Sequence, residues 1–543
     1  MLLVLLAVCV CVVECVWMKY DYQVSSQFTK PFQIINSAHG NGPTLPEGAM
    51  FGFSVANLGD LNGDSVEDFV VGAIGESCSD DDGAELVRCG AVYILFMRQG
   101  ALVESHVRIT NLLNGGPQYL QANDNFGHGV APAGDVDGDG IVDLVVGAPG
   151  TYTGGSLYVF FMNSNGTARS HTLIRGAENG NGPPVKHMGR FASSMANIGD
   201  LDLDGKDEVA VGMADFASGR SRVYILSFHT NGTVSTYKEL ILQKFDGSVY
   251  TPLINTDFGY AIANVGDING DGIDDVAVGA RKNTDPKGVV EGGAIYVCMM
   301  NTSKEVLDFN ILTDASPEEA KHIALEAYDW CGAGIASIGD FNRDDLRARY
   351  PNRARKPSDP HFGQPSIPDM VVGCPQTDSL GDSGKYKLFF MAEDGVHYDT
   401  IEPPYKYPER APQLRAQESF GAAIAKMSDL DGNGLQQFMI GAPGGVGEFP
   451  GTGSLYVIFL RRRAHHPPSF NVLMYWLQII GPLFGLCMCC IIATVAFFIY
   501  FRRKPTDIEL AVKNAGLEIG LQRKREKLVK PVKVAAVYSD DYE

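Results

Sequence analysis

One motif occurs six times in this sequence and constrains the fold more than any other feature. Its clearest copy, residues 126–158, reads as a short strand, a nine-residue acidic loop, a second strand, a glycine turn and a third strand. The first aspartate of the loop recurs at intervals of 65 to 89 residues. A unit repeated in this way predicts an array of equivalent supersecondary structures. The six loops begin at Asp60, Asp135, Asp200, Asp267, Asp340 and Asp429.

The residues around each loop repeat as well. The runs between loops are short, rich in β-branched and aromatic residues, and bounded by Gly and Pro, which is typical of strands. The residue nine positions before each loop is Phe51, Phe126, Phe191, Phe258, Cys331 or Phe420. The third run of each unit carries Tyr93, Tyr158, Tyr224, Tyr296, Tyr386 or Tyr456. Each unit therefore predicts at least three strands.

A fourth strand is expected after each tyrosine strand except the last. The candidates are residues 106–110, 172–175, 239–242, 309–312 and 398–401. Repeated four-stranded sheets predict an all-β propeller. Residues 32–35 have strand character but no hairpin of their own, so we expect them to complete the sixth sheet and close the ring, which protects its open edges. Six blades are counted, and a seven-bladed ring is the alternative.

The acidic loops have the composition of a calcium site. Calcium takes six to eight oxygen ligands from a tight loop, with side chains at alternate positions and one backbone carbonyl. Tight turns alone would also explain Asp, Asn and Gly, but a turn does not require a further carboxylate at position 9. We therefore predict Ca²⁺, in preference to magnesium, at positions 1, 3, 5, 7 and 9 of four loops. These ligands are Asp60, Asn62, Asp64, Val66 and Asp68; Asp135, Asp137, Asp139, Ile141 and Asp143; Asp200, Asp202, Asp204, Lys206 and Glu208; Asp267, Asn269, Asp271, Ile273 and Asp275.

The fifth and sixth loops depart from this pattern. The fifth begins with Asp340, Asn342 and Asp344 and then meets a basic, Pro-rich segment, residues 346–366. Without that segment Asp369 falls at position 9, so we predict an insertion into an intact cation loop. The insertion is either a genuine exposed loop or retained intronic sequence. The sixth loop has glutamine at position 9, and whether it binds a cation stays open.

The two ends of the sequence predict a type I membrane protein. Residues 1–18 are read as a signal peptide, with a signal anchor as the alternative. The apolar run 472–501 is long enough for one transmembrane helix and is followed by Arg502, Arg503 and Lys504. Between them lie a predicted ectodomain, 20–460, and a short stalk, 461–471; the tail is 502–543. Glycosylation motifs at Asn165, Asn231 and Asn301 favour an extracellular ring at the plasma membrane.

Charge and cysteines agree with an extracellular setting. The formal net charge is −20, which argues against a nucleic-acid partner and fits acidic loops that take cations. Cys78 and Cys89 flank one acidic loop and are predicted to form a disulfide. Cys331 and Cys374 lie on neighbouring antiparallel strands and are a second candidate pair. Cys298 then remains as a buried thiol.

Phe-Gly, the Asp-rich loop and Gly-Ala-Pro together resemble the FG-GAP repeat of integrin α subunits. The sequences FGFSV at Phe51 and DLDGNG at Asp429 are especially similar. The resemblance implies a calcium-binding propeller that serves adhesion, with the opposite face contacting a ligand and a β-like subunit. The integrin pattern has seven repeats with cation loops in the later ones, leg domains after the propeller and, in some members, an inserted adhesion domain; none of these is seen here. The chain is also similar to the T-cell immunomodulatory protein and linkin group, which combine FG-GAP repeats with one membrane span.

Two functions are therefore weighed. The first is a cell-surface receptor whose propeller binds an extracellular protein or glycan. The second is a membrane-tethered scaffold for a neighbouring membrane protein on the same cell, which the short stalk favours. An enzyme is not expected, because the sequence contains neither a nucleophile elbow nor an HExxH motif.

Overall fold

The computed structural model describes part of the chain, and all of that part lies within one compact unit, Met1–Arg463. The described residues are 22–24, 32–151, 154–175, 182–184, 189–215, 220–252, 254–284, 288–313, 325–341, 367–376, 383–391, 397–401, 412, 414, 417–430, 435–444 and 451–462. The predicted signal peptide, the insertion 346–366, the segment 472–501 and the tail lie outside these residues. Within them, no helix has the length and hydrophobicity needed to cross a bilayer.

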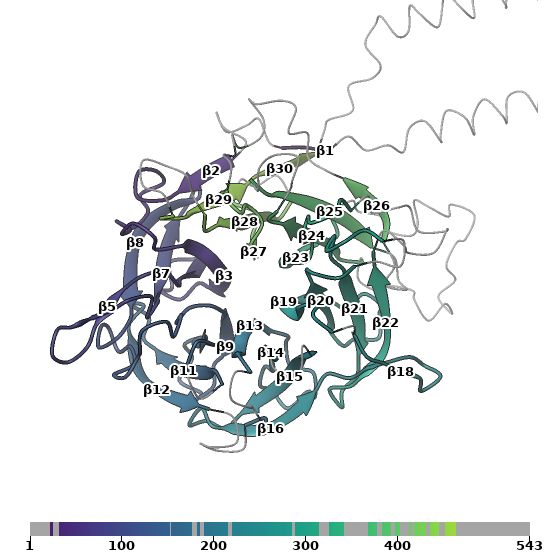
Figure 1. The fold of residues 1–543 in the computed structure, drawn as a ribbon, viewed down its shortest axis with the longest axis horizontal. Helices are drawn as coiled ribbons and strands as arrows, with labels where there is room; N and C mark the ends of the chain where they lie inside the picture. Colours follow the sequence, from purple (N-terminus) through teal and green to yellow (C-terminus); the bar gives the residue numbers. More distant parts are fainter. Residues whose placement is uncertain are drawn as a thin grey trace, which may run out of the picture. The chain divides into compact units, whose positions relative to one another are not determined.

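Six four-stranded antiparallel sheets surround a common centre, as predicted from the repeats (Figure 1). We call them blades 1 to 6 in chain order. The innermost strands are β3 (Phe51–Gly59), β9 (Val130–Gly134), β13 (Phe191–Asn197), β19 (Phe258–Gly266), β23 (Gly334–Gly339) and β27 (Ala423–Met427). The second strands are β4 (Asp68–Ala73), β10 (Asp143–Ala148), β14 (Val209–Asp215), β20 (Asp275–Ala280), β24 (Asp369–Cys374) and β28 (Gln437–Ala442).

The outer two strands of each blade complete the sheets. The third strands are β7 (Ala91–Arg98), β11 (Ser156–Met162), β15 (Arg220–Phe228), β21 (Ile295–Met300), β25 (Lys385–Met391) and β29 (Ser454–Ile458). The outermost strands are β8 (Leu102–Ile109), β12 (Ala168–Ile174), β16 (Val234–Glu239), β22 (Val306–Leu312), β26 (His397–Ile401) and β2 (Phe32–Ile35). Each acidic loop therefore joins the first strand of a blade to its second.

The ring is closed by the N-terminal part of the chain, as the sequence predicted. Strand β2 is the outermost strand of blade 6 and pairs with β29, with Phe32 opposite Ile458 and Ile35 opposite Leu455. A further short pair joins β1 (Tyr22–Val24) to β30 (Leu460–Arg462). β30 ends two residues beyond the predicted boundary at 460. Closure removes the exposed sheet edge that an open array would present.

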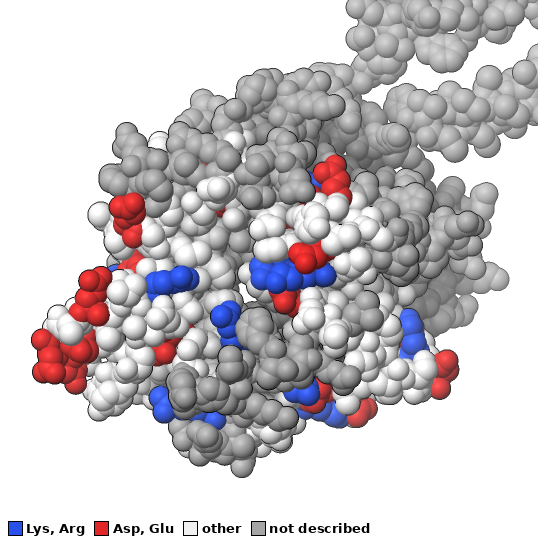
Figure 2. Space-filling view, viewed as in Figure 1, with Lys and Arg blue, Asp and Glu red and all other residues white. Residues whose placement is uncertain are grey.

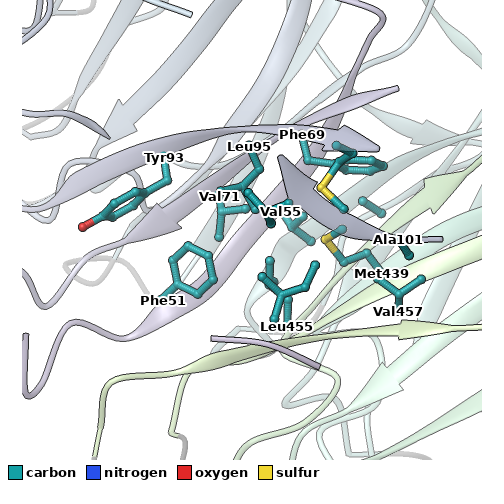
Figure 3. Packing of buried hydrophobic residues seen from close by; sticks show 14 of the residues in the cluster. Phe51, Val55, Phe69, Val71, Tyr93, Leu95, Ala101, Met439, Leu455 and Val457 are labelled. Carbon is teal, nitrogen blue, oxygen red and sulfur yellow. The ribbon is translucent and has the colours of Figure 1, made fainter. Parts of the chain in front are cut away.

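The hydrophobic core lies between neighbouring blades. Except for β14, the second strands are buried along their whole length, because each blade packs against a neighbour on both faces. Figure 3 shows the cluster between blades 6 and 1, where Phe51 and Val71 meet Leu455 and Met439. The blades approach so closely that a Cβ atom on Gly72 would lie 2.0 Å from the carbonyl oxygen of Gly127. This contact explains why the second strand carries glycine at that point.

Two small hairpins project from this framework. β5 (Cys78–Ser79) pairs with β6 (Glu85–Leu86), and β17 (Leu242–Gln243) pairs with β18 (Val249–Tyr250). The β5–β6 hairpin carries a run of acidic residues, seen as a red cluster at the edge of the face in Figure 2. A disulfide joins Cys78 to Cys89 at the base of this hairpin, which confirms the predicted pair.

Blade 5 corrects one detail of the sequence alignment. In the other blades the residue before the repeated tyrosine pairs with the glycine of the second strand, as Val92 pairs with Gly72. In blade 5 it is Tyr386 itself that pairs with Gly373. Lys387, which is fully buried, therefore takes the tyrosine position, and Tyr386 packs against Phe420 of blade 6.

The same blade replaces an aromatic pair with a disulfide. In blades 1, 2, 4 and 6 the repeated phenylalanine meets the repeated tyrosine edge to face, with ring centroids 5.1 to 5.6 Å apart. In blade 5 the phenylalanine position holds Cys331, which is bonded to Cys374. This confirms the second candidate pair, and Cys298 is the buried thiol that remains among the described residues.

Candidate cation-binding loops

In loops 1 to 4 the aspartate at position 1 shapes the loop by accepting hydrogen bonds from the loop's own backbone. In blade 1, Asp60 Oδ1 accepts the N–H groups of Gly63 at 2.7 Å and Asp64 at 2.9 Å, and Asp60 Oδ2 accepts the N–H of Ser65 at 2.7 Å. Asp135, Asp200 and Asp267 accept equivalent bonds in blades 2, 3 and 4. Such side-chain-to-backbone bonds are what fold an Asp-Gly-rich segment into a tight loop.

The residue at position 9 is fully buried; it begins the second strand in five blades and directly precedes it in blade 3. In blade 1 the two carboxylate oxygens of Asp68 accept the N–H groups of Leu61 and Met97, each at 3.1 Å. Asp143, Asp275 and Asp369 accept the equivalent pair in blades 2, 4 and 5. Position 9 therefore ties the loop to the end of the third strand.

Burial disfavours the ionised form of these position-9 carboxyl groups. It raises the pKa of Asp68 to about 6 and the pKa values of Asp143 and Asp275 to about 7, although their backbone hydrogen bonds act in the opposite direction. The neighbouring loop carboxylates add to the increase. A bound cation would reverse this balance by favouring the ionised form.

Loops 2 and 3 bring three carboxylates together. One oxygen each from Asp135, Asp137 and Asp143 lies within 4.8 Å of the others, and the same holds for Asp200, Asp202 and Glu208. Within the described part of the chain, Asp137 Oδ1 and Asp202 Oδ1 are buried and have no hydrogen-bond partner. Buried carboxylate oxygens without a partner are unfavourable unless a ligand completes them, so these donor sets fit a divalent cation.

Loops 1 and 4 have asparagine at position 3 and a different arrangement. Asn62 Nδ2 donates to Asp64 Oδ2 at 3.0 Å, and Asn269 Nδ2 donates to Asp271 Oδ2 at the same distance. The asparagine oxygens accept the N–H groups of Asp64 and Asp271. The predicted position-3 and position-5 ligands of these loops thus bond to one another, and among the described residues three carboxylates converge within 4.8 Å only in loops 2 and 3.

The remaining predicted ligands also have definite places. The N–H groups of the position-7 residues Val66, Ile141, Lys206 and Ile273 donate to the position-5 aspartates at 2.8 to 2.9 Å. In blade 5, Asp340 and Asp369 are described, and Asn342 and Asp344 lie outside the described residues. Asp369 occupies the structural position of the other position-9 residues, where the proposed excision of the insertion had placed it.

Gln437 shows what position 9 does without a charge. It is fully buried, and its Oε1 accepts the N–H of Leu430 at 2.6 Å, while Nε2 donates to the carbonyl of Leu435 at 3.1 Å. The sixth loop therefore keeps the bond from position 9 to the N–H of its second residue and loses one carboxylate. Asp431 and Asn433 of this loop lie outside the described residues.

Two basic side chains next to the loops were not predicted from the sequence. Arg169 pairs with Asp139 at 2.6 Å and also with Asp137. Lys304 pairs with Asp202 at 2.6 Å and with Glu208 at 3.0 Å. Burial opposes the charge on Lys304, but its hydrogen bonds to these carboxylates hold its pKa above the ordinary value. Lys304 lies in a turn between a third and a fourth strand. An alignment of these turns would have singled it out, whereas an alignment of the acidic loops does not include it.

The predicted glycosylation sites all lie in turns between third and fourth strands. Asn165 and Asn231 are exposed and hold the same place in their turns, where each Oδ1 accepts the N–H and hydroxyl of a threonine two residues on. Asn301 stands two positions earlier in its turn and is half-buried. Its Oδ1 accepts the N–H groups of Ser303 and Glu305. The three sites are therefore not fully equivalent.

Comparison with known proteins identifies the repeat. The FG-GAP repeat matches residues 258–298, and the FG-GAP-like repeat matches residues 135–211. Over 246 residues, 42% of this chain, the sequence is 30% identical to integrin alpha-5 of Xenopus laevis, of which it covers 20%. It is 31% identical to integrin alpha-4 of Xenopus laevis over 159 residues, covering 28% of this chain and 14% of that protein. It is 28% identical to integrin alpha-PS2 of Drosophila melanogaster over 265 residues, which are 46% of this chain and 18% of that protein.

These matches and the six-bladed ring show an FG-GAP propeller like that of integrin α subunits. The chain spans about a fifth of the length of these relatives or less. The similarity therefore concerns the propeller.

Proposed function

We propose that this integrin-α-like FG-GAP propeller is a calcium-stabilised binding module at the cell surface, and that it recognises an extracellular protein or glycan without catalysing a reaction. The observation that supports calcium best is the second loop, where Asp135, Asp137 and Asp143 converge within 4.8 Å. Asp137 Oδ1 in this loop is buried without a hydrogen-bond partner among the described residues. Hard oxygen ligands in this number and spacing suit calcium better than magnesium, which keeps most of its water.

The proposed role of calcium is structural. The chain supplies loops whose backbone is already folded by position 1 and tied to the third strand by position 9. A bound cation would supply the positive charge that offsets their clustered carboxylates. Because an unfolded loop holds no such site, binding contributes directly to the stability of the blade.

Attachment to the plasma membrane forms the second part of the proposal. It rests on the apolar run 472–501, on the basic residues that follow it, and on the glycosylation motifs of the propeller. The integrin α relatives add a candidate partner class, a β-like subunit, and a candidate ligand class, extracellular protein.

A second candidate function is a scaffold for a neighbouring protein on the same membrane. Strand β30 continues to Arg462, so residues 463–471 alone separate the last strand from the proposed membrane segment. Such a short connection favours partners held on the same surface over ligands presented by another cell.

Chelation tests the calcium proposal. Removing calcium with EGTA from the full-length chain is expected to lower the melting temperature by several degrees, because a cation present at 100 times its dissociation constant contributes about 2.7 kcal/mol per site. Asp137→Asn should reduce this calcium-dependent shift, and Asp81→Asn, in the exposed β5–β6 hairpin, should leave it unchanged. An identical melting temperature with and without calcium would exclude a stabilising cation.

Two binding experiments separate the receptor from the scaffold. Cells that display the full-length chain are tested for calcium-dependent attachment to matrix proteins and to other cells, and attachment above that of untransfected cells supports the receptor. Proximity labelling on the same cells supports the scaffold if it recovers membrane proteins of that cell while attachment stays at background.

A further inference from the structure

One turn has the same backbone in blades 2, 3 and 4. It joins the third strand to the fourth and contains the residues 163–167, 229–233 and 301–305. The N–H of the first residue donates to the carbonyl of the fifth at 2.8 to 3.0 Å, and the N–H of the fourth donates back to the first at 2.8 to 2.9 Å. The fourth residue is Gly166 with φ 79°, Gly232 with φ 75° and Lys304 with φ 60°. Lys304 thus occupies a left-handed position that favours glycine.

Glycine in blades 2 and 3 makes room for an aromatic ring of the preceding blade. A Cβ atom on Gly166 would lie 3.0 Å from Cζ of Phe96, and one on Gly232 would lie 3.1 Å from Cζ of Phe161. Strand register places Ser227 at the same point of blade 3, immediately before the bulge in the third strand. Between blades 3 and 4, serine therefore replaces the ring and lysine replaces the glycine.

The space that this exchange opens is filled by the lysine side chain. Lys304 crosses from blade 4 to blade 3, and its side chain is only 10% exposed. Its Nζ contacts Ser227 Oγ at 2.6 Å, Asp202 Oδ2 at 2.6 Å and Glu208 Oε1 at 3.0 Å. An ammonium group has three N–H donors, and these three oxygens can satisfy all of them.

A change at position 9 of the third loop accompanies Ser227 and Lys304. Position 9 of this loop is glutamate, whereas it is aspartate in loops 1, 2, 4 and 5. In loop 2 the second carboxylate oxygen of Asp143 accepts the N–H of Met162 at 3.0 Å. In loop 3 the corresponding oxygen of Glu208 accepts the hydroxyl of Ser227 at 3.1 Å and contacts Lys304. Ser227, Lys304 and Glu208 thus form one set that differs together from the other blades.

We propose that Lys304 is the built-in counter-ion of the third loop and keeps the affinity of that loop for calcium far below that of the second loop. The inference rests on the proposed calcium binding of the other loops. A calcium ion entering loop 3 would have to displace a buried ammonium with three partners, or lie within a few ångströms of its like charge. Lys304 thus determines how many of the predicted calcium sites are occupied.

The basic residue beside loop 2 does not have this effect. Arg169 lies on β12 of the same blade, and its side chain is 44% exposed. It can therefore turn into water when a cation binds, and no buried space is left behind. Exposed ion pairs of this kind contribute little to stability. The two loops present similar carboxylates, and the burial of the basic residue distinguishes them.

Bound calcium per chain measures the proposed effect. The full-length chain is dialysed against labelled calcium at the lowest free concentration that saturates the wild type. Lys304→Gly/Ser227→Phe, which restores the packing of blades 2 and 3, is expected to bind one more calcium ion per chain. Adding Asp202→Asn to this variant should remove the extra ion. Lys238→Met, which breaks an exposed ion pair with Glu305 at the same interface, should bind as the wild type does.

Equal calcium binding by the wild type and by Lys304→Gly/Ser227→Phe, with both chains folded by circular dichroism, would overturn the inference. If the wild type binds no calcium at all, the proposed calcium function fails, and melting in EGTA then decides the role of Lys304. Lys304→Met should melt well below Lys238→Met, because it leaves Glu208 buried without its counter-ion. Equal melting temperatures of these two variants would show that Lys304 is not the counter-ion.

Discussion

Single residues of the acidic loops serve the fold and the candidate site at once. Position 1 folds the loop through bonds to its backbone, and position 9 ties the loop to the third strand, as Asp68 does. The sequence predicted these residues as ligands because Asp and Asn at alternate positions suit calcium. The same residue types also make tight turns, so the pattern alone could not separate the two roles. At position 9, Gln437 separates them, because it keeps the bond to the Leu430 N–H and lacks the charge.

His128 provides a residue-scale prediction of pH dependence. Burial lowers its pKa to about 4, against the opposing effect of its hydrogen bond to the Ser193 carbonyl at 2.6 Å; the charges of Arg190 and Arg281 lower it further. An unfolded chain would bind a proton at this histidine below about pH 6.5, and the folded ring does not. The contribution of His128 to stability should therefore fall as pH falls from 6.5 towards 4, whereas the raised pKa values of Asp68, Asp143 and Asp275 act in the opposite direction.

The expected loss of the His128 contribution across this window is on the order of 3 kcal/mol. His128→Phe, which places here the residue that blade 1 has at Phe53, should remove this contribution, so that the melting temperature of the variant falls less, relative to the wild type, between pH 6.5 and 4. The exposed His229 is the matched control, and His229→Gln should retain the wild-type profile. A His128→Phe chain with an unchanged slope would contradict the assignment.

At the scale of strands, the repeats predicted the topology well and the register less well. Turn residues, apolar runs and the missing outer strand of blade 6 together placed β2 correctly. The alignment nevertheless placed Tyr386 where the structure has Lys387. A strand that is buried on both faces has no polar side, so its hydrophobic pattern does not fix its register. Only the pairing of Tyr386 with Gly373 shows that the register of this strand differs by one residue from that of the other third strands.

Closure by β2 gives a prediction at this scale. Ile35 is fully buried in the cluster between blades 6 and 1, where it lies opposite Leu455. Ile35→Ala should lower the free energy of unfolding by about 2 to 5 kcal/mol, because it removes buried apolar atoms at the point where the ring closes. Val249→Ala, at a position 64% exposed on β18, should change it by less than about 0.5 kcal/mol. Denaturant unfolding of the full-length chain measures both, and similar values for the two variants would show that closure does not depend on this strand.

The whole ring contains relations that no single repeat carries. Aligned copies show each blade separately, and the contacts of Gly166 with Phe96 and of Lys304 with Ser227 cross from one blade to the next. The sequence therefore predicted four similar cation loops, and the structure distinguishes the third by a residue 96 positions after its last ligand. Such differences become visible only when neighbouring blades are placed side by side.

The orientation of the whole molecule can be tested through the glycosylation motifs. If the propeller is extracellular, peptide N-glycosidase should lower the apparent mass of the chain isolated from cells. Asn165→Gln and Asn231→Gln should each remove one glycan, because both side chains are exposed in the folded turn. Asn301→Gln should change the mass less, since Asn301 is half-buried and its Oδ1 accepts two N–H groups of its own turn. A chain that carries no glycan at any of the three sites, although it reaches the surface, would remove the support that these motifs give to the proposed orientation.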